Sequence, residues 1–214
     1  MIEWLDKEPE RLNRWHRSAA RGYSWRKKPS KYHVLVAEFL LQRTQPVQVA
    51  RVYDVFVSKW PDIESIVHAR ENQLTKVLLP LGRTHRAKEI KKAFKFIKEK
   101  WGVIPDTEEE LKLIPGVGNY IARAVLCFAV KKPLGLIDPG IIRVFNRFFC
   151  LESSKARAHT DKQLWEVADS LVPNKNPDRY NLALLDLAAL VCTAKSPKHE
   201  DCPIKTNCCF FGAA

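Results

Sequence analysis

The chain has 214 residues, of which 46 % are apolar and 28 % are charged, and this composition predicts a folded domain with a sizeable core rather than a disordered chain. Its longest apolar runs are about ten residues, well below the roughly twenty that a membrane helix needs, and its first residues lack a signal-peptide pattern, so we expect an intracellular protein of the cytoplasm or nucleoid with no membrane partner. Thirty-six Lys and Arg against 24 Asp and Glu give a net charge of +12, which favours DNA or RNA as the partner, although a solvated helix surface can also carry such charge.

Most of the chain has the apolar spacing of helices. Val34–Gln42 is an apolar run too long and too rich in Leu for a strand, so it predicts a buried helix. Further helices are expected, in chain order, over Val47–Trp60, Arg86–Trp101, Gly118–Val130, Ile141–Phe149, Asp161–Leu171 and Asn181–Val191. No run alternates convincingly as a strand does, so we predict an all-α fold with short loops.

One segment in the middle of the chain is the most informative. Thr107 and Glu110 form the capping box of a short helix, which Pro115 and Gly116 end. Gly116 and Gly118 permit positive φ, and the helix that follows offers unpaired N–H groups that bind phosphate. This pattern is typical of a helix–hairpin–helix motif that clamps a DNA backbone. An ordinary tight turn between packed helices is the alternative.

Asp138 follows an apolar stretch and comes just before the expected helix at Ile141. A lone Asp at such a place is usually a helix N-cap. The helix dipole would keep its carboxylate ionised, and an ionised carboxylate can stabilise a developing cation. The cap and a catalytic role therefore do not exclude each other.

Several motifs together resemble the helix–hairpin–helix DNA glycosylases of the endonuclease III superfamily. They are Ile114–Tyr120, Ala124–Ala129 and Asp138 with Arg143–Arg147, and at the front Tyr23–Arg26 and Ala37–Gln45, which resemble the mismatch-specific branch. The resemblance spans nearly the whole chain. It implies two helical lobes, one over residues 31–134 with the hairpin at 111–130, the other over 1–30 and 135–214. It also implies that a monomer binds double-stranded DNA with a mismatch or lesion and flips the target nucleotide out of the stack.

The resemblance gives three residues catalytic roles. Asp138 aligns with the family's catalytic Asp, which stabilises the oxocarbenium-like sugar or directs water onto it. Glu38 would lie in the base pocket and protonate or hydrogen-bond the departing base, or place water, whereas an exposed or salt-bridged Glu is the alternative. Tyr120 stands where bifunctional members have Lys, and a phenol cannot form a Schiff base. Tyr120 would line the pocket, with packing on the hairpin helix as the alternative.

The resemblance also implies contacts with DNA. Gln42 matches the residue that fills the gap left by the flipped base, and Leu81 matches an apolar wedge beside the partner base. Gln42 as a helix cap and Leu81 as a core residue are the alternatives. Gly116, Gly118 and Arg143 complete the expected DNA-binding set.

A cysteine group near the end of the chain predicts a metal site. Many relatives hold a [4Fe–4S] cluster through four Cys spaced x6, x2 and x5, and here the same spacing connects Cys192, His199, Cys202 and Cys208. Because all four positions keep the family's register and His can ligate iron, the resemblance implies a structural [4Fe–4S] cluster with His199 at one position. A zinc ion on the same Cys3His set, or a site that has lost its metal, is the alternative.

The other cysteines fit less directly. Cys127 and Cys150 lie in apolar helical segments, so we expect buried, inert thiols. Cys209 could replace a metal ligand, but adjacent cysteines rarely both reach one site. A disulfide framework is a further alternative, which the expected intracellular location disfavours.

The resemblance therefore predicts a monofunctional DNA glycosylase of base excision repair, which hydrolyses the N-glycosidic bond of T or U opposite G and lacks efficient AP lyase activity. Adenine removal opposite G or oxidised G is the alternative within the family. Tyr120 argues against it, since adenine-removing relatives usually have Ser there, as does the lack of room for their extra C-terminal domain. A DNA-binding module without catalysis is the alternative of another class, and it would need neither Asp138 nor Glu38.

Overall fold

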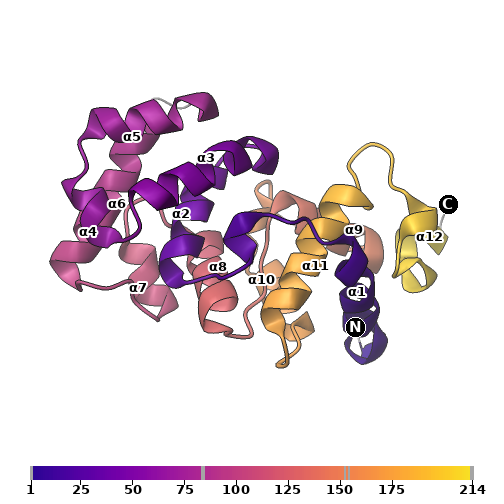
Figure 1. Ribbon diagram of the computed structural model, residues 1–214. Coiled ribbons are helices and arrows are strands. Elements are labelled where there is room, and N and C mark those ends of the chain that lie inside the picture. Colours follow the sequence, from indigo (N-terminus) through magenta and orange to yellow (C-terminus); the bar gives the residue numbers. More distant parts are fainter. Residues whose placement is uncertain (1, 83–84, 152, 154, 213–214) are drawn as a thin grey trace. The chain divides into compact units, whose positions relative to one another are not determined.

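The computed structural model describes residues 2–82, 85–151, 153 and 155–212. Over these ranges the chain is helical and contains no strand, which confirms the predicted all-α class (Figure 1). None of the described helices is long and apolar enough to cross a membrane. Contacts within the chain separate two compact units: unit 1 joins the residues up to Arg21 with those from Lys131 onward, and unit 2 is Gly22–Val130.

Unit 2 is built around the apolar helix α2 (Lys31–Leu41). Every residue from Val34 to Leu40 is buried, so α2 is a core helix covered on all sides, in agreement with its unbroken apolar run. Helices α3 (Pro46–Lys59) and α8 (Asn119–Val130) pack against it (Figure 1). The other elements of unit 2 are η1 (Ser24–Arg26), α4 (Ile63–His68), α5 (Glu71–Leu78), η2 (Leu79–Leu81), α6 (Arg86–Lys100) and α7 (Glu108–Leu113).

Apolar spacing predicts the longer helices of unit 2 well. The bounds of α3, α6 and α8 lie close to the predicted ones, and Thr107 caps α7 by accepting a hydrogen bond from the Glu110 backbone N–H at 3.3 Å. The short helices α4 and α5 were not predicted, because so few turns give little apolar periodicity. Trp25 of η1 is buried and lies edge-on to Tyr53 of α3 at 5.3 Å, so unit 2 includes residues before Lys31.

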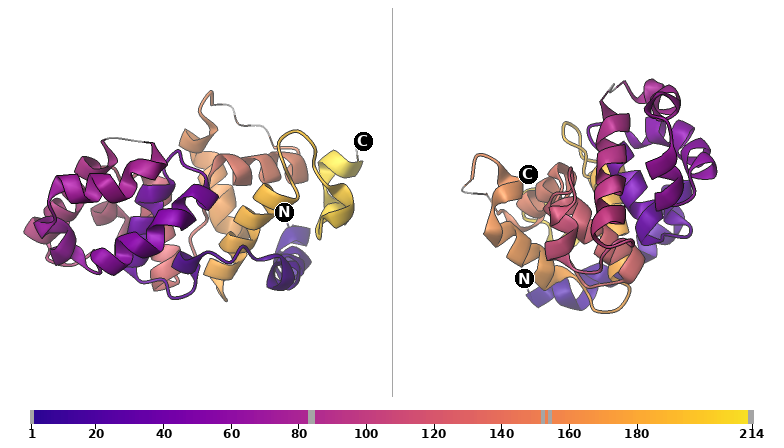
Figure 2. Two further views of the ribbon diagram at one scale, coloured as in Figure 1. Left: turned by 45° about the horizontal axis from the view of Figure 1, so that its top comes forward. Right: turned by 90° about the vertical axis from the view of Figure 1, so that its left-hand side faces the viewer.

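Unit 1 packs α1 (Ile2–Ala19) against α11 (Pro177–Leu190), and α11 against α9 (Pro139–Phe149) (Figure 2). The other elements of unit 1 are η3 (Ala158–Thr160), α10 (Lys162–Leu171), η4 (His199–Asp201), η5 (Lys205–Asn207) and α12 (Cys209–Gly212). The predicted helices of this region are confirmed. Helices α9 and α11 each begin earlier than expected, at a proline, which suits the first turn of a helix because its missing N–H would have no partner there.

A buried ion cluster joins the end of α1 to α11. The Asp186 carboxylate is fully buried, accepts hydrogen bonds from the Arg21 backbone N–H at 2.9 Å and from Arg21 Nε at 2.5 Å, and lies 2.9 Å from His16 Nε2. A buried carboxylate is tolerated when such partners replace its water. No local sequence pattern pairs these residues, since the partners come from opposite ends of the chain.

Candidate functional site: hairpin, catalytic residues and cofactor pocket

The hairpin between α7 and α8 depends on one glycine. Gly116 has a φ of +85°, and a Cβ there would lie 3.0 Å from the Phe39 ring, so the turn requires glycine. Gly118 differs from the expectation, because its φ is not positive and a Cβ there would meet no protein atom within 4 Å. Helix α8 starts directly after Gly118, so the N–H groups of its first turn have no intrahelical acceptor and can bind a phosphate.

Gln42 connects the end of α2 to this hairpin. Its backbone N–H donates to the Glu38 carbonyl at 3.2 Å, and its side-chain Nε2 donates to the Gly116 carbonyl at 3.0 Å. Gln42 therefore ends its helix, as the alternative from the sequence allowed, and also touches the hairpin. Two residues predicted to contact DNA thus lie together on unit 2, and the gap-filling role of Gln42 stays a prediction.

Leu81 lies in the core of unit 2, with only 7 % of its surface exposed, whereas Leu79 in the same turn is 66 % exposed. A side chain that enters a base stack has to be accessible. As placed, Leu81 fits the core role that the sequence left as the alternative, and a wedge role would require the η2 turn to open.

Glu38 and Tyr120 belong to helices that pack against each other in unit 2. Glu38 is only 8 % exposed, so it is not the exposed helix residue that was one of its alternative interpretations. Tyr120 is half-buried in the first turn of α8, next to the hairpin. The packing of α2 on α8 brings the two helices together, and the catalytic roles of both residues stay predictions.

Asp138 lies in unit 1 as the N-cap of α9. Its Oδ1 accepts a hydrogen bond from the Ile141 backbone N–H at 2.6 Å, so the predicted cap is present. Gly140 makes room for this carboxylate, because a Cβ there would lie 2.9 Å from Ala188 Cβ and 3.2 Å from Asp138 Oδ1. The carboxylate is thus held tightly in place at the start of the helix.

The pKa of Asp138 shifts in the direction opposite to the one that the helix dipole alone predicts. Burial raises the pKa of Asp138 above its ordinary value, and this effect outweighs the hydrogen bonds from the Ile141 and Gly140 N–H groups and the charges of Arg143 and Arg21, all of which lower it. The helix dipole, on which the expectation rested, favours the charged form. Desolvation, which depends on the tertiary structure, has the larger effect.

Arg143 and Arg147 on α9 hold the segment that carries the first cysteine of the metal motif. Arg143 Nε donates to the Cys192 carbonyl at 2.7 Å and its Nη2 to the Ala188 carbonyl at 2.8 Å. Arg147 Nη1 donates to the Thr193 carbonyl at 2.7 Å and lies 3.5 Å from Cys192 Sγ. The structure therefore gives Arg143 a role in supporting the segment around Cys192, and its contact with DNA stays a prediction.

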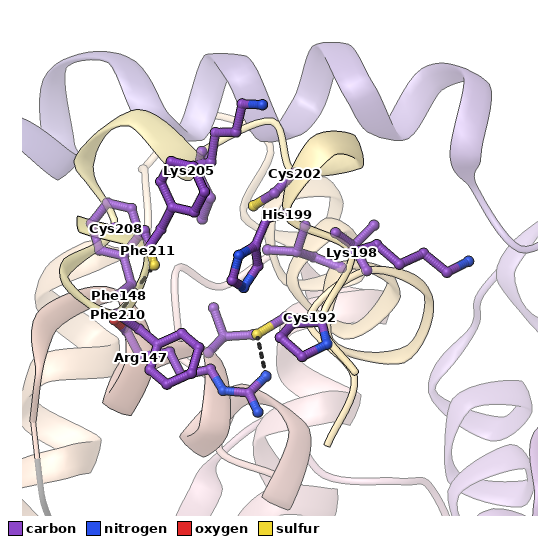
Figure 3. A pocket seen from close by; sticks show the side chains of 15 residues that line it. Arg147, Phe148, Cys192, Lys198, His199, Cys202, Lys205, Cys208, Phe210 and Phe211 are labelled. Atoms are coloured by element: carbon purple, nitrogen blue, oxygen red, sulfur yellow. Dashed lines mark hydrogen bonds between the residues drawn. The ribbon is translucent and has the colours of Figure 1, made fainter. Parts of the chain in front are cut away.

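The four predicted metal ligands line one pocket in unit 1, and Figure 3 shows the sulfur atoms of Cys192, Cys202 and Cys208 around the ring of His199. The walls of the pocket are largely apolar and include Val144, Phe148, Leu187, Val191 and Ile204. Three thiols and an imidazole in an apolar pocket fit an iron–sulfur cluster.

Two properties describe how these donors could bind a metal. Burial, together with the nearby Cys208, Cys192 and Glu8, raises the pKa of Cys202 to about 11, so a metal would have to displace the thiol proton at neutral pH. Among the described residues, no group of three or more His, Cys, Asp or Glu side chains is arranged to hold a metal ion.

The expectation for Cys150 is wrong, because Cys150 is exposed and forms a disulfide with Cys209, with Cα atoms 5.8 Å apart. The left-handed backbone at Cys150 ends α9 and turns the chain outward, which the apolar pattern did not reveal. Cys127 is a buried free thiol, as predicted. Because Cys209 is engaged with Cys150, it is not a replacement ligand in this structure.

The predicted residues are divided between the two units. Unit 2 contains the hairpin with Glu38, Gln42 and Tyr120, and unit 1 contains Asp138 and the cofactor pocket. Several supporting residues were not predicted, among them Arg86, Asp186 and Arg21. Only Asp186 has a signal in the sequence, as a charged residue within an apolar run, and such a signal does not identify the partner.

Comparisons with known proteins agree with these motifs. Residues 36–170 match the HhH-GPD superfamily of base excision DNA repair proteins, and residues 192–208 match the iron–sulfur binding domain of endonuclease III. The chain is 38 % identical over 207 residues to a thymine-DNA glycosylase of Aeropyrum pernix, covering 94 % of this chain and 92 % of that protein. It is 39 % identical over 204 residues to a thymine/uracil-DNA glycosylase of Pyrobaculum aerophilum, covering 92 % and 88 %.

Solved structures extend the similarity to the fold. The structure of a thermostable thymine-DNA glycosylase matches with a TM-score of 0.93 at 28 % identity, covering 100 % of this chain and 99 % of that one. An endonuclease III–DNA complex matches with a TM-score of 0.76 at 19 % identity over 94 % of both chains, which is a similarity of fold. On the family match and these near full-length identities, the chain belongs to the HhH-GPD superfamily of base excision DNA repair proteins.

Proposed function

We propose that this protein is a monofunctional DNA glycosylase that removes thymine or uracil mispaired with guanine. The observation that carries the proposal is Tyr120 in the first turn of the hairpin helix, where a Schiff-base mechanism would need Lys. The thymine- and thymine/uracil-DNA glycosylases that resemble this chain over nearly their full length support the choice of base. The net charge of +12 supports binding to duplex DNA.

The hairpin would hold the DNA backbone, and the target nucleotide would leave the stack. The N–H groups in the first turn of α8, which have no intrahelical acceptor, would bind a phosphate next to Gly118. The buried carboxyl of Glu38 would hydrogen-bond or protonate the departing base. Phosphate contacts of this kind carry no base preference, so the choice of base would come from the pocket.

Asp138 would act on the sugar. As the N-cap of α9 it has a fixed position, so its ionised form could stabilise the positive charge that develops as the N-glycosidic bond breaks, or could direct water onto the sugar. The nearby charges of Arg21 and Arg143 favour that ionised form. Because no amine stands at position 120, the product would be an intact abasic site.

We further propose that Cys192, His199, Cys202 and Cys208 hold a [4Fe–4S] cluster, which would order the loop without taking part in base release. The match of residues 192–208 to the iron–sulfur binding domain of endonuclease III supports a cluster over a zinc ion on the same donors. Iron and zinc analysis of the purified protein tests this assignment. Zinc without iron would contradict it.

The experiment that tests the activity uses one labelled duplex with T·G, U·G, A·G or A opposite oxidised G, each analysed with and without alkali. We expect strand cleavage at T·G and U·G that depends on alkali, because alkali cleaves abasic sites. Cleavage on the adenine strand alone would place the enzyme with the adenine-removing relatives. Tight binding without base release on any duplex would contradict the proposal and favour a DNA-binding module.

A further inference from the structure

Arg86 is the first residue of α6 and the largest fully buried side chain in the structure, with 1 % exposure. A buried guanidinium loses its hydration, so it is stable only where acceptors replace the lost water. Three acceptors of Arg86 lie at one place, the end of α2 and the turn that follows.

The guanidinium makes three hydrogen bonds there. Nη1 donates to the Leu40 carbonyl at 3.0 Å, and Nη2 donates to the Gln42 carbonyl at 3.0 Å and to Thr44 Oγ1 at 2.7 Å. The last carbonyls of a helix have no intrahelical donor and carry partial negative charge, so a cation is favourable at this position. The planar fork of Arg spans these separate acceptors, whereas the single ammonium of Lys does not match them.

The segment that Arg86 holds is the α2–α3 turn, residues 42–45. Arg43 in this turn is exposed and has a left-handed φ of 54°, a conformation that a residue with a side chain keeps only where its surroundings hold it. Gln42 in the same turn donates to the Gly116 carbonyl of the hairpin. The turn is therefore held from inside by Arg86 and is joined on its outside to the hairpin.

We propose that Arg86 is a positioning residue for DNA binding: it holds the α2–α3 turn in the shape that presents Gln42 and Arg43 beside the hairpin. This inference rests on the proposed function, since it takes this surface of unit 2 to face DNA. It adds Arg43 as a contact with the DNA backbone. Arg86 itself does not touch DNA.

The test compares two variants with a matched control. Arg86→Lys removes the fork. Thr44→Val removes one acceptor of Arg86, together with the 3.3 Å hydrogen bond that the Thr44 hydroxyl donates to the Gln42 carbonyl, while both backbone acceptors stay. The control is Lys91→Met on the same helix, because Lys91 donates to the Ala69 carbonyl at the end of α4, away from the turn. Binding of a T·G duplex is measured in an Asp138→Asn background, so that the duplex stays intact. Base release is measured with Asp138 present, as a single turnover at saturating enzyme. Folding is measured as the thermal midpoint.

We expect Arg86→Lys to weaken duplex binding about tenfold, the loss typical of one charge-assisted hydrogen bond, and Thr44→Val only about threefold, because both backbone acceptors of the fork remain. Base release from the saturated complex should stay within about threefold, because the chemistry lies elsewhere. Lys91→Met should lower the thermal midpoint but leave binding within about twofold.

A double-mutant cycle with Arg43→Ala separates positioning from general stabilisation. If Arg86 acts by placing Arg43, Arg43→Ala weakens binding in the wild-type turn but adds little in the Arg86→Lys protein. Equal losses in both backgrounds, or a binding loss from Lys91→Met as large as that from Arg86→Lys, would overturn the inference. If the wild-type protein binds the duplex but releases neither T nor U, the proposed function fails while the binding comparison still tests Arg86.

Discussion

Asp138 combines two opposing influences on one carboxyl. The hydrogen bonds at the start of α9 and two nearby guanidinium groups favour its ionised form, whereas burial disfavours it more strongly. The glycosylase mechanism that we propose needs the ionised form, so the fold holds a charge at this point at a cost to its own stability. Such a conflict between local stability and chemistry is typical of a functional position.

The conflict predicts opposite effects of Asp138→Asn on activity and stability. Base release should fall by about 10² or more, while DNA binding is kept. The pKa of Asp138 is raised in the folded state. The contribution of its protonated form to folding stability is therefore fully present below the pKa of the unfolded state, and it is lost as the pH rises through the pKa of the folded state. Asn cannot ionise and still caps the helix, so the variant should melt at a higher temperature than the wild type near neutral pH, with the difference disappearing in acid. A lower midpoint at neutral pH would contradict the argument.

Tyr120 allows a gain-of-function prediction. Tyr120→Lys should place an amine where the sugar reacts, so that borohydride traps a covalent complex with T·G DNA and strand cleavage no longer needs alkali. Asn119→Lys is the matched control, because it puts the same amine on the exposed neighbouring residue of the same turn. A folded Tyr120→Lys protein that binds DNA and gives no trapped complex would show that position 120 does not face the sugar.

At the scale of elements, the hairpin glycines make different contributions. Gly116 is required by the fold, through its positive φ and its contact with Phe39, whereas a methyl group at Gly118 meets no protein atom. A methyl group at Gly118 could therefore interfere only with something outside the protein. This separates a residue that shapes the hairpin from one that leaves room for a ligand.

Gly118→Ala should leave the thermal midpoint unchanged and weaken binding to matched and mismatched duplexes by a similar factor, about three to tenfold, because a phosphate contact has no sequence preference. Gly116→Ala, the comparison variant, should destabilise the fold by about 1 kcal/mol or more. Filter binding on several duplexes and thermal melting measure both effects. A loss confined to the T·G duplex would be inconsistent with a backbone clamp.

The sequence predicted those elements that have a strong local signal. The apolar run of α2, the capped helix α7 and the glycines of the hairpin contain their own patterns, and the structure has helices and a turn there. The roles of Arg86, Asp186 and Cys150 could not be predicted, because the partner of each is remote in sequence. These partners are the α2–α3 turn, Arg21 and Cys209. Spacing reports which face of a helix is apolar, not which residue lies opposite.

At the scale of the whole molecule, unit 1 fixes the end of the chain at several points around the cofactor pocket. The disulfide joins Cys209 to Cys150 at the end of α9, and Asn207 donates to Glu8 of α1 at 2.9 Å. Cys208, the last expected ligand, lies between these two attachments, and its Sγ is 3.5 Å from the Arg147 carbonyl. The position of this ligand is therefore set by the protein as well as by any cluster.

This arrangement predicts that Cys209→Ser destabilises unit 1 even without a cluster. The bond closes a loop with a sequence separation of 59 residues, and the chain-entropy relation gives about 4 kcal/mol for such a loop, or roughly 10 °C in the thermal midpoint of a chain of this size. Thermal melting of the metal-free protein measures the shift. Dithiothreitol should lower the midpoint of the wild type to that of Cys209→Ser and leave the variant unchanged. If the reductant lowers both midpoints equally, the disulfide does not carry the effect; if it lowers neither, the metal-free loop is not held by this bond.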